Sequence, residues 1–323
     1  MASLAKPVVC IVTPGTRSAN NGNWRTAVRW AGMLRDRYRP IVQTAWSGER
    51  ADVLIALHAR RSAESIARFH ERAEGRRMAV VLTGTDLYKD LPDSREAAAS
   101  LDGADRIVVL QDDALRLLPA QWRRKAQVIF QSAPLLATRP KARGRLDCVM
   151  VGHLRDEKDP RTLFEAVRRI PRELAIRVRH IGAPLDPALG DAARALAQED
   201  PRYRYVGALP HGLARVAIQR AHVLVHPSVV EGGANVIVEA VTAGTPVIAS
   251  RISGNVGMLG RDYPGFFAPR DAQALAKRLV QALEEPAALA CLRSACARRK
   301  RLFRPQAEAA AIRSLAASLL AGR

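Results

Sequence analysis

The chain has 323 residues, of which 48% are hydrophobic, and 51 Lys and Arg against 31 Asp and Glu give a formal charge of +20. This hydrophobic share excludes a disordered chain, and no apolar run approaches the roughly 20 residues that span a bilayer. The four cysteines lack the spacing of a metal site or a disulfide scaffold, so we interpret them as structural and reduced. Because one hydrophobic core stops growing near about 250 to 300 residues, we expect two domains.

The net charge of +20 is only weak evidence for a polyanionic partner such as a nucleic acid. Most of the basic residues are Arg spread evenly along the chain, as coding bias also produces. Nucleic-acid-binding proteins combine such charge with a recognisable motif or with aromatic side chains for stacking, and we find neither. We therefore expect no nucleic acid partner. The first six residues do not resemble a secretion signal, which favours a cytoplasmic protein without membrane insertion.

The first half alternates short β-branched runs with stretches of helical period, the pattern of a parallel sheet with crossover helices. Trp24, Val28, Ala31 and Leu34 predict the buried stripe of one such helix. Strands are expected at residues 8–13, 41–44, 53–57, 79–83, 107–110 and 128–130.

Behind a basic linker expected at residues 138–145, the same α/β rhythm starts again. Strands are expected here at residues 148–151, 176–181, 205–206, 223–226 and 247–250. The sequence thus predicts two doubly wound, Rossmann-like α/β domains, residues 1–140 and 146–304, which face a central cleft with the carboxyl ends of their strands. Residues 305–323 predict a helix that can cross back to the first domain.

The most informative segment is a pair of carboxylates, Glu231 and Glu239, around a helix start. Four residues open this helix: Gly232, Gly233, Ala234 and Asn235. The glycines remove side chains where backbone N–H groups point outwards, which suits a diphosphate. Glu239 can accept hydrogen bonds from a ribose diol, and Glu231 would face the group beyond the diphosphate. A Gly-Gly pair alone is as typical of a solvated loop, but the two carboxylates favour a nucleotide site.

This Glu-x7-Glu segment, between His-Pro-Ser and Ala-Gly-Thr-Pro-Val, resembles the donor site of GT-B glycosyltransferases, a nucleotide-sugar class. Lys158 matches a Lys that holds the donor diphosphate in that class. His153 stands where an Arg is usual, and Arg155 lies two residues away from it. These cations would stabilise the leaving diphosphate without a metal. We interpret Asp112 and Asp113 as a helix N-cap and not as a metal-binding pair.

Two loops of the first half extend the resemblance. Asn21 and Gly22 match a loop that approaches the donor sugar in GT-B enzymes, and residues 83–86 match a Gly-x-Asp turn. With the His58-Ala-Arg-Arg-Ser string, the Gly-His-Leu-Arg-Asp-Glu-Lys string from residue 152 and Gly-Asn-Val-Gly from residue 254, they resemble the selenosugar synthases of selenoneine biosynthesis (SenB-type). That family joins a sugar from a UDP-sugar to the selenium of selenophosphate.

The resemblance implies UDP-glucose or UDP-N-acetylglucosamine as donor, selenophosphate as acceptor, and no cofactor or metal. It implies a catalytic set of His58, Glu231 and Lys158. Selenophosphate needs nearby cations to approach an anionic diphosphate, and Arg guanidinium groups suit such contacts. We expect the acceptor at six residues: Arg17, Arg25, Arg60, Arg61, Thr85 and Asp86.

Other interpretations stay open. Arg60 and Arg61 equally fit a solvated helix start, and His58 fits a structural group at a strand end. A GT-B transferase with a lipid or polysaccharide acceptor is the nearest alternative, and a binding protein without catalysis is another. The sequence leaves open the preferred sugar, the retaining or inverting outcome and the oligomeric state.

Overall fold

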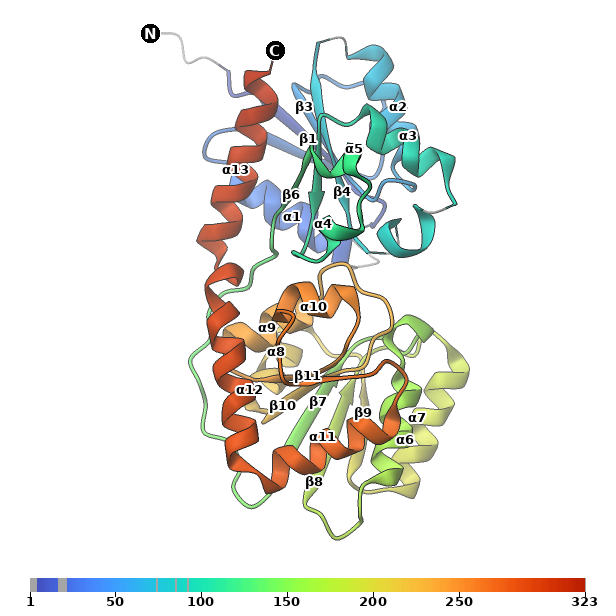
Figure 1. The fold of residues 1–323 in the computed structure, drawn as a ribbon. Helices are drawn as coiled ribbons and strands as arrows, with labels where there is room; N and C mark the ends of the chain where they lie inside the picture. The colour runs from blue at the N-terminus through green and yellow to red at the C-terminus, as the bar shows by residue number, and fades with distance from the viewer. Residues whose placement is uncertain (1–4, 17–21, 74, 85, 92, 323) are drawn as a thin grey trace. The chain divides into compact units, whose positions relative to one another are not determined.

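The computed structural model describes residues 5–16, 22–73, 75–84, 86–91 and 93–322 (Figure 1). The chain forms two units: unit 1 comprises residues 1–131 and 305–323, and unit 2 comprises residues 132–304. The first boundary therefore lies at Gln131, before the expected residue 140. Residues beyond it belong to unit 2 because they bond there; Gln219 Nε2, for example, donates to the Ala137 carbonyl at 2.6 Å.

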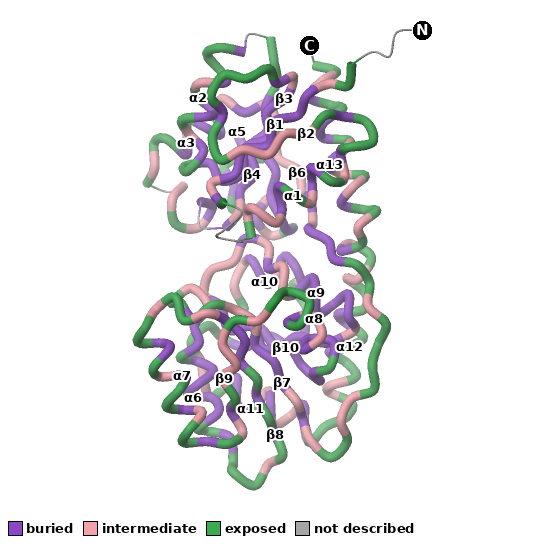
Figure 2. The backbone as a smooth tube through the Cα atoms, turned by 180° about the vertical axis from the view of Figure 1, so that it is seen from behind, coloured by how far each residue is buried: buried purple, intermediate pink, exposed green. Residues whose placement is uncertain are grey.

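Six parallel strands form the sheet of unit 1: β1 (Val8–Val12), β2 (Arg39–Gln43), β3 (Val53–Leu57), β4 (Arg77–Leu82), β5 (Arg106–Val109) and β6 (Ala126–Val128). Their order in the sheet is β2-β1-β3-β4-β5-β6. Side chains alternate between two cores, so that Cys10 and Val12 enter one and Val9 and Ile11 the other. Every residue of β1 and β3 is consequently buried (Figure 2), as in sheets covered on both faces.

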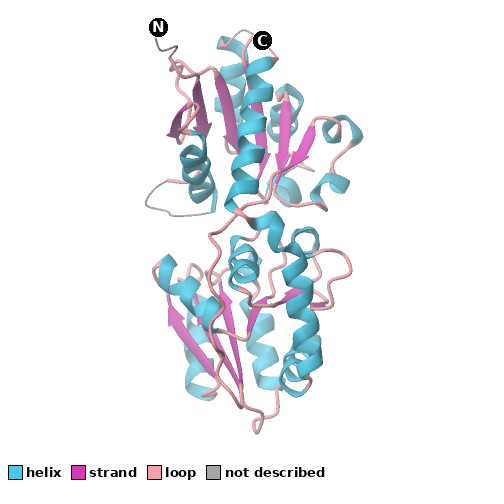
Figure 3. Cartoon of the chain, turned by 90° about the vertical axis from the view of Figure 1, so that its left-hand side faces the viewer, coloured by secondary structure: helices cyan, strands magenta, loops and turns pink. Residues whose placement is uncertain are grey.

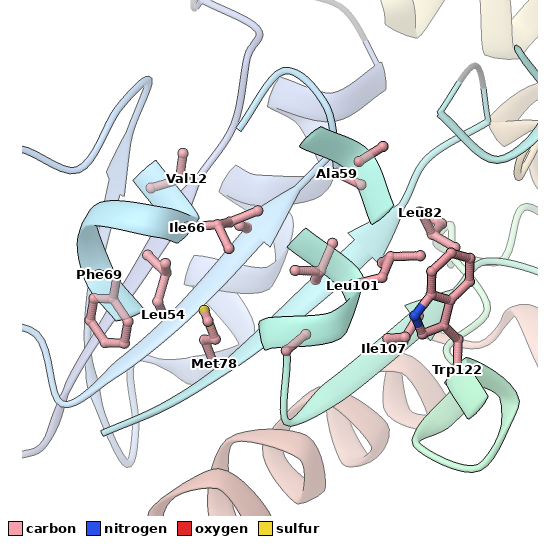
Figure 4. Packing of buried hydrophobic residues seen from close by; sticks show 14 of the residues in the cluster. Val12, Leu54, Ala59, Ile66, Phe69, Met78, Leu82, Leu101, Ile107 and Trp122 are labelled. Atoms are coloured by element: carbon pink, nitrogen blue, oxygen red, sulfur yellow. The ribbon is translucent and has the colours of Figure 1, made fainter. Parts of the chain in front are cut away.

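The helical elements of unit 1 are α1 (Gly22–Leu34), α2 (Ala63–Arg72), the π-helix η1 (Asp86–Asp90), α3 (Arg95–Gly103), α4 (Ala114–Leu117), α5 (Ala120–Arg123) and α13 (Pro305–Ala321). On one face of the sheet, Phe69 of α2 and Leu101 of α3 pack in a cluster with Trp122 (Figure 4). On the other face, Trp30 of α1 packs in a cluster with Leu315 of α13.

The stripe expected on α1 is partly wrong. Val28 is 45% exposed, whereas Thr26, Ala27 and Trp30 are buried beside the expected Ala31 and Leu34. The buried face of α1 is therefore turned from the one that Trp24 and Val28 predict, because it has to meet both the sheet and α13.

Unit 2 also has a parallel six-stranded sheet, with strands β7 (Leu146–Val151), β8 (Ile176–Ile181), β9 (Tyr203–Gly207), β10 (Val223–His226), β11 (Val247–Ser250) and β12 (Phe266–Phe267). Their order is β12-β11-β10-β7-β8-β9. The chain proceeds outwards from β7 in one direction and then continues on its other side with β10. The topological switch point therefore lies at the carboxyl ends of the neighbouring strands β7 and β10, which is where ligands of such sheets bind.

Helices flank this sheet (Figure 3). They are η2 (Asp156–Lys158), α6 (Pro160–Arg169), α7 (Pro187–Glu199), α8 (His211–Arg220), α9 (Asn235–Ala243), α10 (Ser253–Leu259), α11 (Ala272–Glu284), α12 (Pro286–Arg299) and η3 (Lys300–Phe303). Within the described ranges, no helix of either unit combines the length and the apolar character needed to cross a bilayer. The expected α/β fold with two Rossmann-like units is confirmed.

One buried group makes the stability of unit 2 depend on pH. His180 of β8 has no exposed surface, and its Nδ1 lies 2.7 Å from the Tyr203 hydroxyl. Burial lowers the pKa of His180 from 6.5 to about 4. Above pH 6.5 the ring is neutral in the folded and the unfolded state, but between pH 6.5 and 4 only the unfolded state takes up the proton.

We therefore expect unit 2 to lose about 3 kcal/mol of stability between pH 7 and pH 4 through His180. Hydrogen exchange of residues 176–181, followed by mass spectrometry across this pH range, measures the effect. His180→Phe keeps an aromatic ring but cannot titrate, so this variant should show a flatter pH dependence. If the stability of residues 176–181 depended on pH equally in His180→Phe and in the unmodified protein, His180 would not be the group responsible.

Candidate active site

The strongest cluster of charged side chains in unit 2 lies at the switch point between β7 and β10. Lys158 Nζ lies 2.5 Å from Glu231 Oε1, and His226 Nε2 lies 3.2 Å from the same oxygen. Lys158 follows β7, whereas His226 is the last residue of β10 and Glu231 lies in the loop behind it. Neighbouring parallel strands end at the same edge, so residues far apart in sequence meet here.

Local backbone structure fixes this cluster. Asp159 adopts a left-handed conformation with φ of +45°, ends η2 and caps α6 by accepting a hydrogen bond from the Thr162 backbone N–H at 3.3 Å. The loop behind β10 is tied to η2, because the Val229 N–H donates to the Glu157 carbonyl at 2.9 Å. Lys158 and Glu231 are thus brought together by the backbone as well as by their charges.

Glu231 is ionised throughout the neutral pH range. Burial disfavours its charged form, but the Lys158 ammonium and the nearby His226 ring outweigh burial and hold the pKa of Glu231 well below its ordinary value. The site therefore combines a fixed anion with a cation that is only 17% exposed. Such a pair can hold polar ligand groups of either sign.

The second expected carboxylate, Glu239, lies in the second turn of α9 and is 8% exposed. Its Oε1 lies 2.5 Å from Nε2 of His211, the first residue of α8. The start of α9, at Ala234 and Asn235, has no side-chain cap. Helix N-termini of this kind attract anions through their free N–H groups and the helix dipole.

The remaining expected donor residues lie in the loop behind β7. His153 is exposed, and its Nδ1 accepts a hydrogen bond from the Ala183 N–H at 3.0 Å. Arg155 has a side chain 48% exposed, with Nε 3.9 Å from Glu157 Oε2. Gly232 and Gly233 precede α9 as expected. The structure brings these residues to one edge of the sheet, and their contact with a diphosphate stays a prediction.

Gly254 lies where α10 meets the Glu231 loop. A Cβ atom on Gly254 would lie 2.0 Å from the Glu231 carbonyl oxygen, far inside van der Waals contact. Only glycine allows this close approach, so Gly254 fixes the position of the Glu231 backbone.

Gly254→Ala should therefore displace the Glu231 loop and destabilise unit 2 by about 2 kcal/mol, as overpacking does elsewhere. Thermal unfolding measures the loss. Gly32→Ala is the control, because a Cβ atom on this helical glycine meets nothing within 4 Å. Equal melting temperatures for the Gly254 variant and the unmodified protein would disprove the steric argument.

In unit 1, the expected His58 lies at the carboxyl end of β3 with φ of +74°, which is unusual for a residue with a side chain. Its ring is 1% exposed; Nδ1 accepts the Arg61 N–H at 3.3 Å, and Nε2 lies 3.7 Å from Asp90 Oδ2. Burial lowers the pKa of His58, so the ring is neutral and carries its proton on Nε2.

Asp86 is expected to contact the acceptor, but in the structure its side chain is buried within unit 1. It has no exposed surface, and burial raises its pKa. Its carboxylate accepts N–H groups of four backbone positions: Ala59, Thr83, Gly84 and Leu87. Asp86 therefore holds this turn together and does not offer its carboxylate to an acceptor in this structure.

The other residues expected at the acceptor differ in exposure, and some lie outside the described residues. Arg60 is half exposed, with Nε 3.3 Å from Asp90 Oδ2, and Arg61 is exposed. Arg25 lies half-buried on α1, and Gly22 is the exposed first residue of that helix. Three expected residues lie outside the described residues: Arg17, Asn21 and Thr85.

Comparison with known proteins shows what part of the chain is similar to. The family described as "Glycosyl transferases group 1" matches residues 145–285, which include the complete Lys158–Glu231 cluster and Glu239. Residues 145–285 are thus similar to group 1 glycosyltransferases. The glycogen synthase of Mycobacterium tuberculosis is 33% identical over 178 residues, which cover 52% of this chain and 41% of that protein. The chain thus spans less than half the length of this relative.

Solved structures similar to both units support the same fold. Sucrose-phosphate synthase from Thermosynechococcus elongatus has a TM-score of 0.77 at 19% identity and covers 98% of this chain and 100% of its own. HepE of Anabaena, solved with UDP and glucose, has a TM-score of 0.76 at 15% identity and covers 97% of this chain and 100% of its own. The chain therefore has the GT-B fold of these proteins.

Two histidines of unit 2 join the site without being expected there from the sequence. His226 contacts Glu231, and His211 contacts Glu239 from 28 residues away. His226 could be suspected because it ends a strand at the ligand edge. For His211 the sequence offers no signal, because its contact depends on how α8 packs against α9.

Proposed function

We propose that the protein is a glycosyltransferase that transfers glucose or N-acetylglucosamine from a UDP-sugar to selenophosphate. The single observation that carries the donor part is the Lys158–Glu231 pair beside the uncapped start of α9, at the switch point of the segment similar to group 1 glycosyltransferases. Structures of HepE with UDP-glucose and with UDP and glucose support the choice of donor.

In the proposed reaction, selenium attacks the anomeric carbon and a C–Se bond forms as the bond from that carbon to the diphosphate oxygen breaks. Negative charge grows on the departing UDP, and fixed cations and N–H groups lower the barrier most effectively at that point. Lys158, Arg155 and the N–H groups after Gly232 are assigned this role. Water then cleaves the P–Se bond, so that phosphate leaves as well.

Glu231 would orient the donor sugar through its fixed carboxylate, and Glu239 would accept hydrogen bonds from the ribose hydroxyls. The acceptor assignment rests on the family resemblance of the sequence and on the exposed guanidinium groups of Arg60 and Arg61. Such groups suit bidentate contacts with an oxyanion. The family resemblance alone assigns His58 to the donor sugar; within unit 1 its Nε2 lies 3.7 Å from Asp90 Oδ2.

A polysaccharide acceptor is the second candidate, favoured by the identity shared with a glycogen synthase. One assay separates the two. The protein is incubated with UDP-glucose or UDP-N-acetylglucosamine and either selenophosphate or a glucan, and mass spectrometry follows UDP and the glycosylated product. A selenosugar formed together with UDP supports the proposal. Turnover with glucan alone would overturn the acceptor part, and absence of turnover with every acceptor would overturn the activity.

A further inference from the structure

His211 stands out among the titratable side chains of unit 2, because the reaction proposed above gives it no role although it touches a donor-site carboxylate. Its Nε2 lies 2.5 Å from Glu239 Oε1. In this contact the imidazole N–H donates and the carboxylate oxygen accepts. The side chain of His211 is 45% exposed, whereas that of Glu239 is 10% exposed. The His211 side chain is thus partly exposed to solvent, whereas the Glu239 carboxylate is largely buried.

The backbone holds His211 in this position. The Pro210 carbonyl accepts hydrogen bonds from the N–H groups of Leu213 and Ala214 at 2.9 and 3.1 Å, so that α8 begins rigidly at His211. Helix α8 packs against α9, which carries Glu239. The contact therefore joins the start of α8 to the second turn of α9, which packs against it, and is not an incidental meeting of side chains.

Within the described part of the chain, the orientation of the Glu239 carboxylate depends on a single ion pair, whereas Glu231 has two ion-pair partners. Glu231 has both Lys158 and His226 as partners, whereas His211 is the ion-pair partner that Glu239 has among the described residues. A buried carboxylate that loses its donor suffers a desolvation penalty and becomes free to rotate. With the His211 bond in place, one lone pair is used, the carboxylate plane is fixed, and the other lone pairs stay available.

We propose that His211 is a positioning residue that orients Glu239 to receive the ribose hydroxyls of a nucleoside diphosphate. This inference rests on the proposed function, which assigns the ribose to Glu239. His211 acts through Glu239, so its effect is confined to ligands that carry those hydroxyls. A ligand without them gains nothing from an oriented carboxylate.

Calorimetric titration of the full chain with UDP and with 2′,3′-dideoxy-UDP tests the inference. His211→Ala should weaken UDP binding about tenfold, as expected for a lost hydrogen bond to a charged group, and leave the affinity for dideoxy-UDP within about twofold. His211→Gln, which can still donate an N–H, should recover most of the UDP affinity. Leu213→Ala, at an exposed position of the same helix, is the matched control.

Equal weakening of both nucleotides by His211→Ala would show a general structural effect and overturn the inference. Unchanged UDP affinity in that variant would overturn it as well, while the proposed function would stand. If the unmodified protein does not bind UDP, the proposed function fails and this inference fails with it.

Discussion

Lys158→Met should lower kcat about 100-fold to 1000-fold, which is the usual effect of removing one group that stabilises charge in a transition state. Lys158 is the best-fixed cation of the candidate site, with its ammonium 2.5 Å from Glu231 and little exposed surface. Methionine keeps an unbranched, apolar side chain that is one atom shorter, and it lacks the charge and the hydrogen bonds. Initial rates of UDP release at saturating donor measure the effect, and a kcat within about threefold of the original would contradict the role.

Lys158 also keeps Glu231 ionised, so its loss could act through the carboxylate alone. The double variant Lys158→Met/Glu231→Gln separates the two effects, because a neutral amide at position 231 no longer needs a cation. If Lys158 stabilises the leaving diphosphate, the double variant should be clearly slower than Glu231→Gln by itself. Equal rates for these two proteins would reduce Lys158 to a partner of Glu231.

Glu308→Ala should destabilise unit 1 by about 3–5 kcal/mol, the cost of breaking a buried pair by removing one partner. The Glu308 side chain on α13 has no exposed surface; its carboxylate accepts Arg29 Nε at 2.9 Å and Trp30 Nε1 at 2.7 Å from α1. Alanine leaves the buried Trp30 indole N–H and the partly buried Arg29 guanidinium without this acceptor. All four tryptophans lie in unit 1, so denaturant unfolding followed by Trp fluorescence reports on this unit.

Arg313→Ala is the matched control on the same helix. Arg313 also bonds to the α1 region, through Asp36 at 2.9 Å and the Met33 carbonyl at 2.9 Å, but its side chain is 33% exposed and that of Asp36 is 52% exposed. Exposed pairs contribute about 0–1 kcal/mol. A loss in Glu308→Ala no larger than that in Arg313→Ala would refute the importance of the buried contact.

The strands could be predicted from the sequence because most of them are buried on both faces. Residues 53–57 are a continuous apolar run, and residues 223–226 and 247–250 are apolar up to their last residue. Residues 176–181 instead begin with alternating apolar and basic side chains, and the structure has strands with the bounds of all four segments. Strand β12, Phe266–Phe267, escapes such a prediction because two residues carry no period. The buried face of α1 cannot be placed locally either, because α13, which it packs against, lies almost 300 residues away in the sequence.

The candidate site could be predicted where residue type and order carry the chemistry, as with Lys158, Glu231 and the glycines before α9. The partners that orient these groups could not be predicted. Whether His211 meets Glu239 depends on helix packing, and the complete burial of Asp86 depends on a π-helical turn that no local pattern indicates. Sequence patterns locate such a site, whereas its supporting contacts follow from tertiary structure.

The position of α13 in the chain has a consequence for the order of folding. Ile312, Leu315 and Leu319 belong to the same core as Trp30 and Leu34 of α1, yet all of unit 2 lies between these two segments. During synthesis, unit 2 has its whole sequence outside the ribosome before α13 emerges. Until then α1 alone covers the face of the sheet in unit 1 that it shares with α13, so we expect the nascent chain to complete its second unit first and its first unit last.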